Sequence, residues 1–142
     1  MSTRSMIGIE NKDGSIDCSY CHCDGHPIVN GAILAGNYNS KEKVRSLLKH
    51  GAMSLLCTEI DPPEGYEHSF DDPCNGVCVF YHRDRGDTLR ITKCYDATRF
   101  VITAKECDCE YVYLFSGGQW LFKPVDGDEF MSVNEYFMAL AE

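Results

Sequence analysis

The sequence has no apolar run long enough to cross a membrane. Its longest apolar stretches are residues 32–35 and 77–81, whereas a membrane-spanning helix needs about 20 consecutive apolar residues. The first residues, Met-Ser-Thr-Arg-Ser-Met-Ile, also lack the apolar core of a secretory signal. We therefore expect a cytoplasmic protein that does not bind membranes. Its nine cysteines should then be reduced, and their odd number argues against a complete set of internal disulfides.

Positive charge is also in short supply. The chain has 13 Lys and Arg against 22 Asp and Glu, which gives a net charge of −9. A field of this sign opposes phosphate backbones, so direct binding of DNA or RNA is not expected. Residues 59–72 and 126–142 each contain several acids and no Lys or Arg. Such segments either make a solubilising surface or suit a partner with a basic groove.

No complete catalytic motif is present. The glycines of Asp24-Gly25 and Asn30-Gly31 lack the lysine or the G-x-G-x-x-G context of a phosphate-binding loop. The five histidines show no pattern of a Cys-His hydrolase, which needs a base beside an activated thiol. Cys18-x-x-Cys21 lies at the end of an expected strand, whereas a redox motif would open a helix. We expect a protein that is not an enzyme, and a cysteine-dependent enzyme is the least favoured alternative.

The 142 residues predict a single α+β domain, residues 1–142, built on an antiparallel sheet of hairpins with short helices. Asp13-Gly14 and Gly117-Gly118 are typical of hairpin turns. Ser40, Asp96 and Ser132 are typical of helix N-caps. Residues 59–73, with three prolines, predict a loop, and residues 83–86 predict the tip of a third hairpin. The expected strands are 6–9, 15–21, 77–81, 88–94, 110–115 and 119–123, and the expected helices are 28–38, 40–51, 96–105 and one after Ser132.

Two dense thiol clusters make zinc the expected cofactor. Three cysteines and two histidines lie within residues 18–26, and a second C-x-C lies at residues 107–109. Zinc needs about four such ligands, and close pairs from two places in a chain can supply them. On a regular strand, however, Cys18 and Cys21 point to opposite faces. Free cysteine is also a common small core residue. The candidate ligands are Cys18, Cys21, Cys23, Cys107 and Cys109, with His22 and His26 as substitutes and His68, Cys74, Cys78 and His82 as a second set.

Several motifs along the chain resemble a family of small phage and prophage proteins. The first half carries Tyr20-Cys21-His22-x-Asp24-Gly25-x-Pro27 followed by Asn30-Gly31. The second half carries Tyr81-His82-Arg83-Asp84-Arg85-Gly86 and Glu110-Tyr111-Val112-Tyr113-Leu114-Phe115. In that family an aromatic residue, commonly Trp, stands at the position of Cys23 and Tyr at that of His26. This departure weakens Cys23 as an ancestral ligand.

The resemblance implies a counter-defence role, because small acidic phage proteins include anti-CRISPR proteins that bind basic nucleic-acid channels of defence nucleases. The expected partner is a host defence protein, in particular a type II CRISPR effector nuclease. The alternative is a sponge that sequesters a nucleotide second messenger through Arg83 and Arg85. The candidate partner-binding residues are Glu64, Glu67, Asp71, Asp72, Asp126, Asp128 and Glu129.

Overall fold

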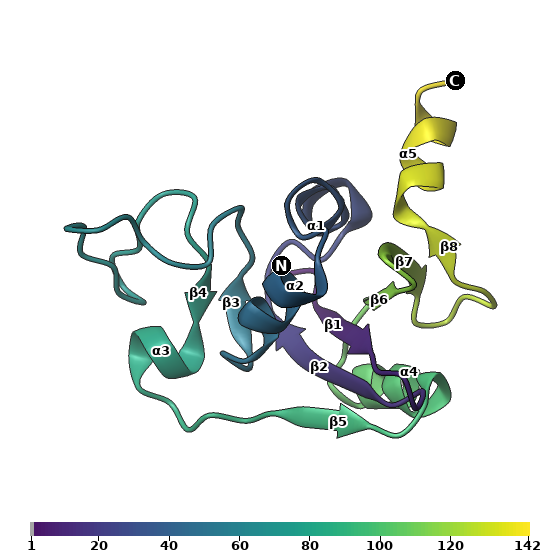
Figure 1. Cartoon of the computed structure of the whole chain (residues 1–142), viewed down its shortest axis with the longest axis horizontal. Helices are drawn as coiled ribbons and strands as arrows, with labels where there is room; N and C mark the ends of the chain where they lie inside the picture. Colours follow the sequence, from purple (N-terminus) through teal and green to yellow (C-terminus); the bar gives the residue numbers. More distant parts are fainter. Residues whose placement is uncertain (1) are drawn as a thin grey trace.

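The computed structural model describes residues 2–142, which fold around one mixed β-sheet (Figure 1). Strand β1 (Ser5–Glu10) pairs antiparallel with β2 (Ile16–Cys21), as the Asp13-Gly14 turn predicts. Strand β6 (Tyr111–Ser116) pairs antiparallel with β7 (Gln119–Pro124) around Gly117 and Gly118, which both have positive φ. The sheet order is β4-β3-β2-β1-β6-β7-β8, and β5 (Thr92–Cys94) pairs with the other part of β2. The α+β class and both of these hairpins are confirmed.

The sheet is mixed, whereas the sequence predicted an antiparallel one. The two hairpins join through β1 and β6, which run parallel, and β2 also pairs parallel with β3 (Met53–Leu55). Strand β3 then pairs antiparallel with the short β4 (Val79–Phe80), and β7 with β8 (Met131–Ser132). Hairpin signals are local, so they predict which strands pair within a hairpin but not how separate hairpins are joined.

Helices cover both faces of the sheet and create two hydrophobic cores. On one face, helices α1 (Ala32–Asn37) and α2 (Lys41–Leu48) contribute Leu34, Val44 and Leu47 to a cluster that includes Ile7 and Tyr113. Helix α1 follows a wide helical turn, η1 (Pro27–Gly31). On the other face, helix α4 (Ala97–Glu106) contributes Phe100 and Ala104 to a cluster with Met6, Cys18 and Val112. Side chains along each central strand point alternately to the two faces of the sheet, so each strand contributes residues to both cores.

Three helices begin at the caps that the sequence predicts. The side chain of Ser40 accepts a hydrogen bond from the backbone N–H of Lys43 at 3.2 Å. Asp96 accepts one from Arg99 at 2.8 Å, and Ser132 accepts one from Glu135 at 3.3 Å at the start of α5 (Val133–Leu140). These bonds satisfy backbone donors that have no partner in the first helical turn.

Residues 83–86 are not the hairpin tip that the sequence predicted. Residues 83–85 belong to helix α3 (Tyr81–Arg85), which directly follows β4. A carboxylate oxygen of Asp84 accepts a hydrogen bond from the backbone N–H of Phe80 at 2.8 Å, which satisfies a donor at the helix start. Gly86 ends the helix with φ 84°, a left-handed conformation that favours glycine. The residue types at positions 83–86 are thus compatible both with a hairpin turn and with the end of a short helix.

Candidate functional site

The acidic loop (residues 59–72) forms most of the long connection between β3 and β4. It projects from one end of the molecule, at the left of Figure 1. The carboxylates of Asp61, Glu64, Glu67, Asp71 and Asp72 are on exposed residues, as a partner-binding surface requires. Tyr66, with 69% of its surface exposed, lies in the chain between Glu64 and Glu67. The loop therefore offers several negative charges and one large aromatic ring to solvent.

Backbone hydrogen bonds close the loop at its base. The N–H of Cys78 donates to the carbonyl of Glu59 at 2.8 Å, and the N–H of Glu59 donates to that of Gly76 at 3.1 Å. Further along, the N–H of Phe70 donates to the carbonyl of Asp84 in α3 at 3.1 Å. The connection is thus pinned at its two ends and near its middle.

Arg83 ties the loop to α3. One terminal nitrogen donates to the carbonyl of Ile60 at 2.7 Å and to the carboxylate of Asp61 at 3.2 Å. The other donates to the carbonyl of Cys78 at 3.0 Å and to Asp84 at 3.2 Å, and Nε donates to Asp84 at 2.9 Å. The guanidinium also lies 4.8 Å from the centre of the Phe80 ring. These contacts engage all three guanidinium nitrogens with the protein.

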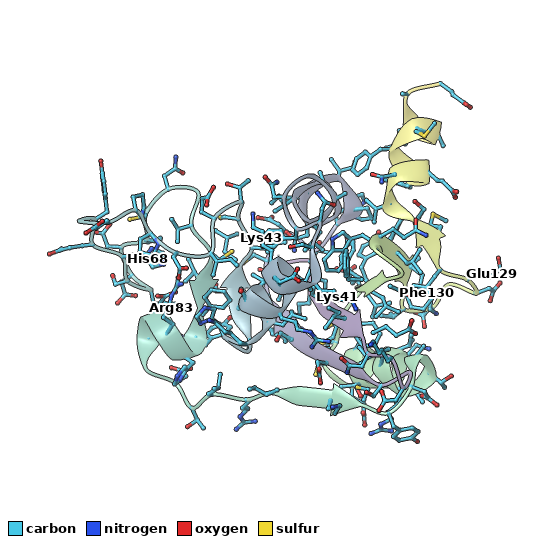
Figure 2. The ribbon with its side chains drawn as sticks, in the orientation of Figure 1. Lys41, Lys43, His68, Arg83, Glu129 and Phe130 are labelled. Carbon is cyan, nitrogen blue, oxygen red and sulfur yellow. The ribbon has the colours of Figure 1, made fainter. Side chains whose placement is uncertain are left out.

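His68 is held between the loop and Asp84. Its Nδ1 accepts a hydrogen bond from the backbone N–H of Cys74 at 2.9 Å, so Nδ1 carries no proton. Its Nε2 must then carry the proton, and lies 3.1 Å from the carbonyl of Cys78 and 3.3 Å from Asp84 Oδ2. The side chains of His68 and Asp84 are both only 3% exposed. Figure 2 shows His68 and Arg83 close together at this end of the molecule.

Asp84 is the centre of this network and is held ionised. Burial alone would raise the pKa of its carboxyl group. Hydrogen bonds from Arg83 and Phe80 and the charge of Arg83 outweigh burial and lower the pKa below its ordinary value. The network therefore ties the acidic loop to α3 at Ile60, Asp61 and His68. The sequence analysis missed Asp84, and the signal that could have revealed it is its spacing from Phe80, four residues earlier.

The two acidic segments lie at opposite ends of the molecule. Figure 2 places Glu129 at the right-hand end and His68 at the left-hand end of the long axis. Asp126, Asp128 and Glu129 are exposed there, and Asp126 forms a 3.4 Å ion pair with Lys105. The candidate partner-binding residues therefore make two separate acidic surfaces, not one continuous face.

The candidate zinc ligands are distributed over both faces of the sheet. Cys18 lies in the core beneath α4, with its Sγ 4.0 Å from that of Cys94, and Cys109 lies in the same cluster. Cys21 lies in the opposite core, where Asn30 donates to its Sγ at 3.5 Å. Cys107 is exposed. The two thiols of the C-x-x-C motif thus point to opposite faces of β2, as strand geometry requires.

The substitute ligands already have other partners. Nδ1 of His22 lies 2.8 Å from the hydroxyl of Tyr20, and Nδ1 of His26 accepts from the backbone N–H of Ile28 at 3.2 Å. Cys74 Sγ donates to the carbonyl of Glu67 at 2.9 Å. Cys23 is partly buried, with its Sγ 3.8 Å from the hydroxyl of Ser2. Cys78 Sγ accepts from the backbone N–H of Cys57 at 3.2 Å.

Across residues 2–142, no group of three or more His, Cys, Asp and Glu side chains is arranged to hold a metal ion. The thiols present do not fit a four-ligand zinc site in this conformation. Zinc binding stays a prediction from the sequence, and elemental analysis of the purified protein tests it.

Arg85 lines an open pocket on the side of α3 away from Arg83. The pocket has a volume of about 470 Å³ and is lined by Ala52, Tyr81, His82, Arg85, Asp87, Thr88 and Arg90. Arg85 and Arg83 therefore do not act together on one ligand, because Arg83 is engaged with the acidic loop. The sequence analysis missed Arg90 and His82 as pocket residues, and no local signal distinguishes them from ordinary surface residues.

Comparison with protein-family models, with curated proteins and with solved structures finds no match. Within residues 2–142 no helix is both long and apolar enough to cross a membrane. Function must therefore be argued from the geometry of the chain itself.

Proposed function

We propose that this protein acts by binding, as a phage-type inhibitor that occupies the basic nucleic-acid groove of a defence nuclease. The observation that carries the proposal is the anchored acidic loop. Six exposed carboxylates are displayed on a segment that Arg83, His68 and Asp84 fix to the sheet and α3.

The anchoring matters because association costs free energy for every segment that must be ordered. A loop already tied to the fold at several points avoids part of that cost. Its carboxylates can then replace phosphates in a basic groove, and complementary charge raises the association rate and the specificity. Tyr66 adds an aromatic side chain of the kind that often dominates binding energy at interfaces.

The state of the thiols supports binding over catalysis. Burial raises the pKa of Cys21 and of Cys109 to about 12, and it also raises the pKa of Cys18. The thiolate is the nucleophilic form of cysteine, so these three residues are poor nucleophiles near neutral pH. Cys18, Cys21 and Cys109 therefore serve as core residues.

The partner that we propose is a type II CRISPR effector nuclease in the cytoplasm of the host cell. Such enzymes hold nucleic acid in a positively charged channel, which suits an acidic inhibitor. The resemblance of the Tyr20–Pro27 and Tyr81–Gly86 motifs to phage proteins supports the same partner.

Charge reversal at each acidic end tests the proposal. Changing Glu64, Glu67, Asp71 and Asp72 to Lys should abolish inhibition of DNA cleavage while the circular dichroism spectrum stays unchanged. Changing Asp126, Asp128, Glu129 and Glu142 to Lys alters the net charge equally at the other end and should leave most inhibition intact. Inhibition that survives the first set of changes would refute the acidic loop as the contact surface. Inhibition that survives both sets of changes would refute the acidic-mimic mechanism altogether.

A further inference from the structure

A second surface of α3 has the opposite electrostatic character from the acidic loop. Residues His82 and Arg85 are three positions apart, so they lie on one side of the helix. Together with Arg90 and Asp87 they line the 470 Å³ pocket, on a chain whose net charge is −9. Two guanidinium groups face one carboxylate there, so one positive charge is left uncompensated.

Arg90 supplies that uncompensated charge. Its side chain is exposed and forms no ion pair with any residue from 2 to 142. The Arg90 backbone passes close to the turn that follows α2, since a Cβ added at Gly51 would lie 2.8 Å from the carbonyl of Arg90. The Arg90 guanidinium keeps its donors for a ligand.

The other pocket side chains are positioned by Asp87. Arg85 donates to both oxygens of Asp87, through Nε at 3.0 Å and through one terminal nitrogen at 2.7 Å. The same guanidinium lies 4.5 Å from the centre of the Phe70 ring and 4.9 Å from that of the Tyr81 ring. His82 Nδ1 lies 2.7 Å from the carbonyl of Asp87, which can only accept, so Nδ1 is protonated and Nε2 is the nitrogen left for other contacts.

We propose that this pocket binds a small molecule that carries a phosphate group. Guanidinium groups bind phosphate oxygens through paired, charge-assisted hydrogen bonds, and Arg90 and the remaining terminal nitrogen of Arg85 can both donate to one phosphate. The volume falls within the range of about 300–1,000 Å³ that is usual for small-molecule sites, which leaves room for an attached group the size of a nucleoside. No carboxylate of the acidic loop lines the pocket, and of these carboxylates only the charge of Asp71 acts on Arg85. The proposal does not rest on the proposed inhibitor function.

The test uses three probes against the full-length protein: inorganic phosphate, adenosine 5′-monophosphate and adenosine. Isothermal titration calorimetry should detect binding of the monophosphate, and no binding of adenosine, which lacks the phosphate. Binding of inorganic phosphate without binding of the monophosphate would show that the pocket takes only a free anion, which would overturn the proposal. Binding of adenosine as tight as that of the monophosphate, or binding of neither phosphate probe, would overturn the proposal.

Arg90→Ala should weaken binding of the monophosphate about tenfold or more, because it removes a charge-assisted contact. Arg99→Ala is the matched control. It removes the same charge from a partly exposed arginine on α4, outside the pocket, that pairs with Glu106. Equal losses in the two variants would show attraction by net charge alone and would refute the pocket.

Discussion

His68 and Asp84 meet across the base of the acidic loop, with His68 Nε2 at 3.3 Å from Asp84 Oδ2 and both side chains 3% exposed. The first residue belongs to the loop and the second to α3, so this contact joins the segment that we propose to bind a partner to the body of the fold. Arg83 reinforces it by donating to both oxygens of Asp84.

Replacing Asp84 with Asn should destabilise the fold by about 3 kcal/mol, because removing one partner of a buried ion pair leaves the others uncompensated. Urea unfolding, followed by the fluorescence of the single tryptophan, Trp120, measures the change. Asp71→Asn removes an exposed carboxylate of the same loop and should change stability by less than about 0.5 kcal/mol. Equal stability of the two variants would show that the network does not hold the loop.

The same network predicts a dependence on pH. The pKa of Asp84 is lower in the folded state than its ordinary value of 3.8, so the folded state binds that proton less tightly than the unfolded state. The contribution to stability is therefore present above pH 3.8 and is lost as the pH falls from there through the folded-state pKa. The stability difference between wild type and Asp84→Asn should shrink over that acidic range. A difference that stays constant there would contradict the assignment.

Tyr38→Phe should cost about 1–2 kcal/mol of stability, because a buried hydrogen bond is lost. The Tyr38 hydroxyl donates to the carbonyl of Cys57 at 2.7 Å, and the residue is fully buried. Tyr95→Phe is the control, since Tyr95 is 75% exposed. Urea unfolding of both variants checks the prediction, and a cost for Tyr38→Phe no larger than that for Tyr95→Phe would count against it.

Gly8→Ala should destabilise the protein by about 1–3 kcal/mol through overpacking. The added Cβ would lie 2.7 Å from a methyl group of Ile16 and 3.2 Å from the Phe100 ring. Gly36→Ala, in helix α1, meets nothing within 4 Å and should be neutral or stabilise by about 0.5–1 kcal/mol. Thermal unfolding distinguishes the two, and a neutral Gly8→Ala would show that α4 packs less closely on β1 than described.

Native alkylation with iodoacetamide should modify Cys107 well before Cys18, Cys21 and Cys109. Burial and the charges of Glu106 and Asp108 raise the pKa of Cys107, but its residue is exposed. The other three are buried with raised pKa values, so both access and thiolate formation oppose reaction. Mass spectrometry of digests locates the adducts, with unfolded protein as the control in which all nine cysteines react. Early labelling of Cys109 would contradict the described core.

The parts of the fold that sequence predicts are those with local causes. Asp13-Gly14 and Gly117-Gly118 mark two hairpins, and Ser40 and Asp96 mark two helix starts, because each acts on residues beside it in the chain. The parallel pairing of β1 with β6 joins distant segments and leaves no such local sign.

The candidate site likewise has features with local causes and features that depend on the tertiary fold. The exposure of Glu64 and Asp71 follows from composition and from the prolines of the loop. The engagement of Arg83 with the carbonyls of Ile60 and Cys78 depends on tertiary folding, so sequence reasoning offered it as a ligand-binding residue. The separation of the two acidic segments is likewise a property of the assembled sheet.

The most direct test of the inhibitor proposal is the affinity of the purified protein for a guide-loaded type II CRISPR nuclease, measured with and without target DNA already bound. The account predicts binding to the DNA-free enzyme that weakens as salt rises, since exposed charges are screened within about 8 Å at physiological ionic strength. It predicts that bound target DNA prevents this binding. Equally tight binding to the DNA-occupied nuclease, or no binding to the DNA-free nuclease at low salt, would contradict the account.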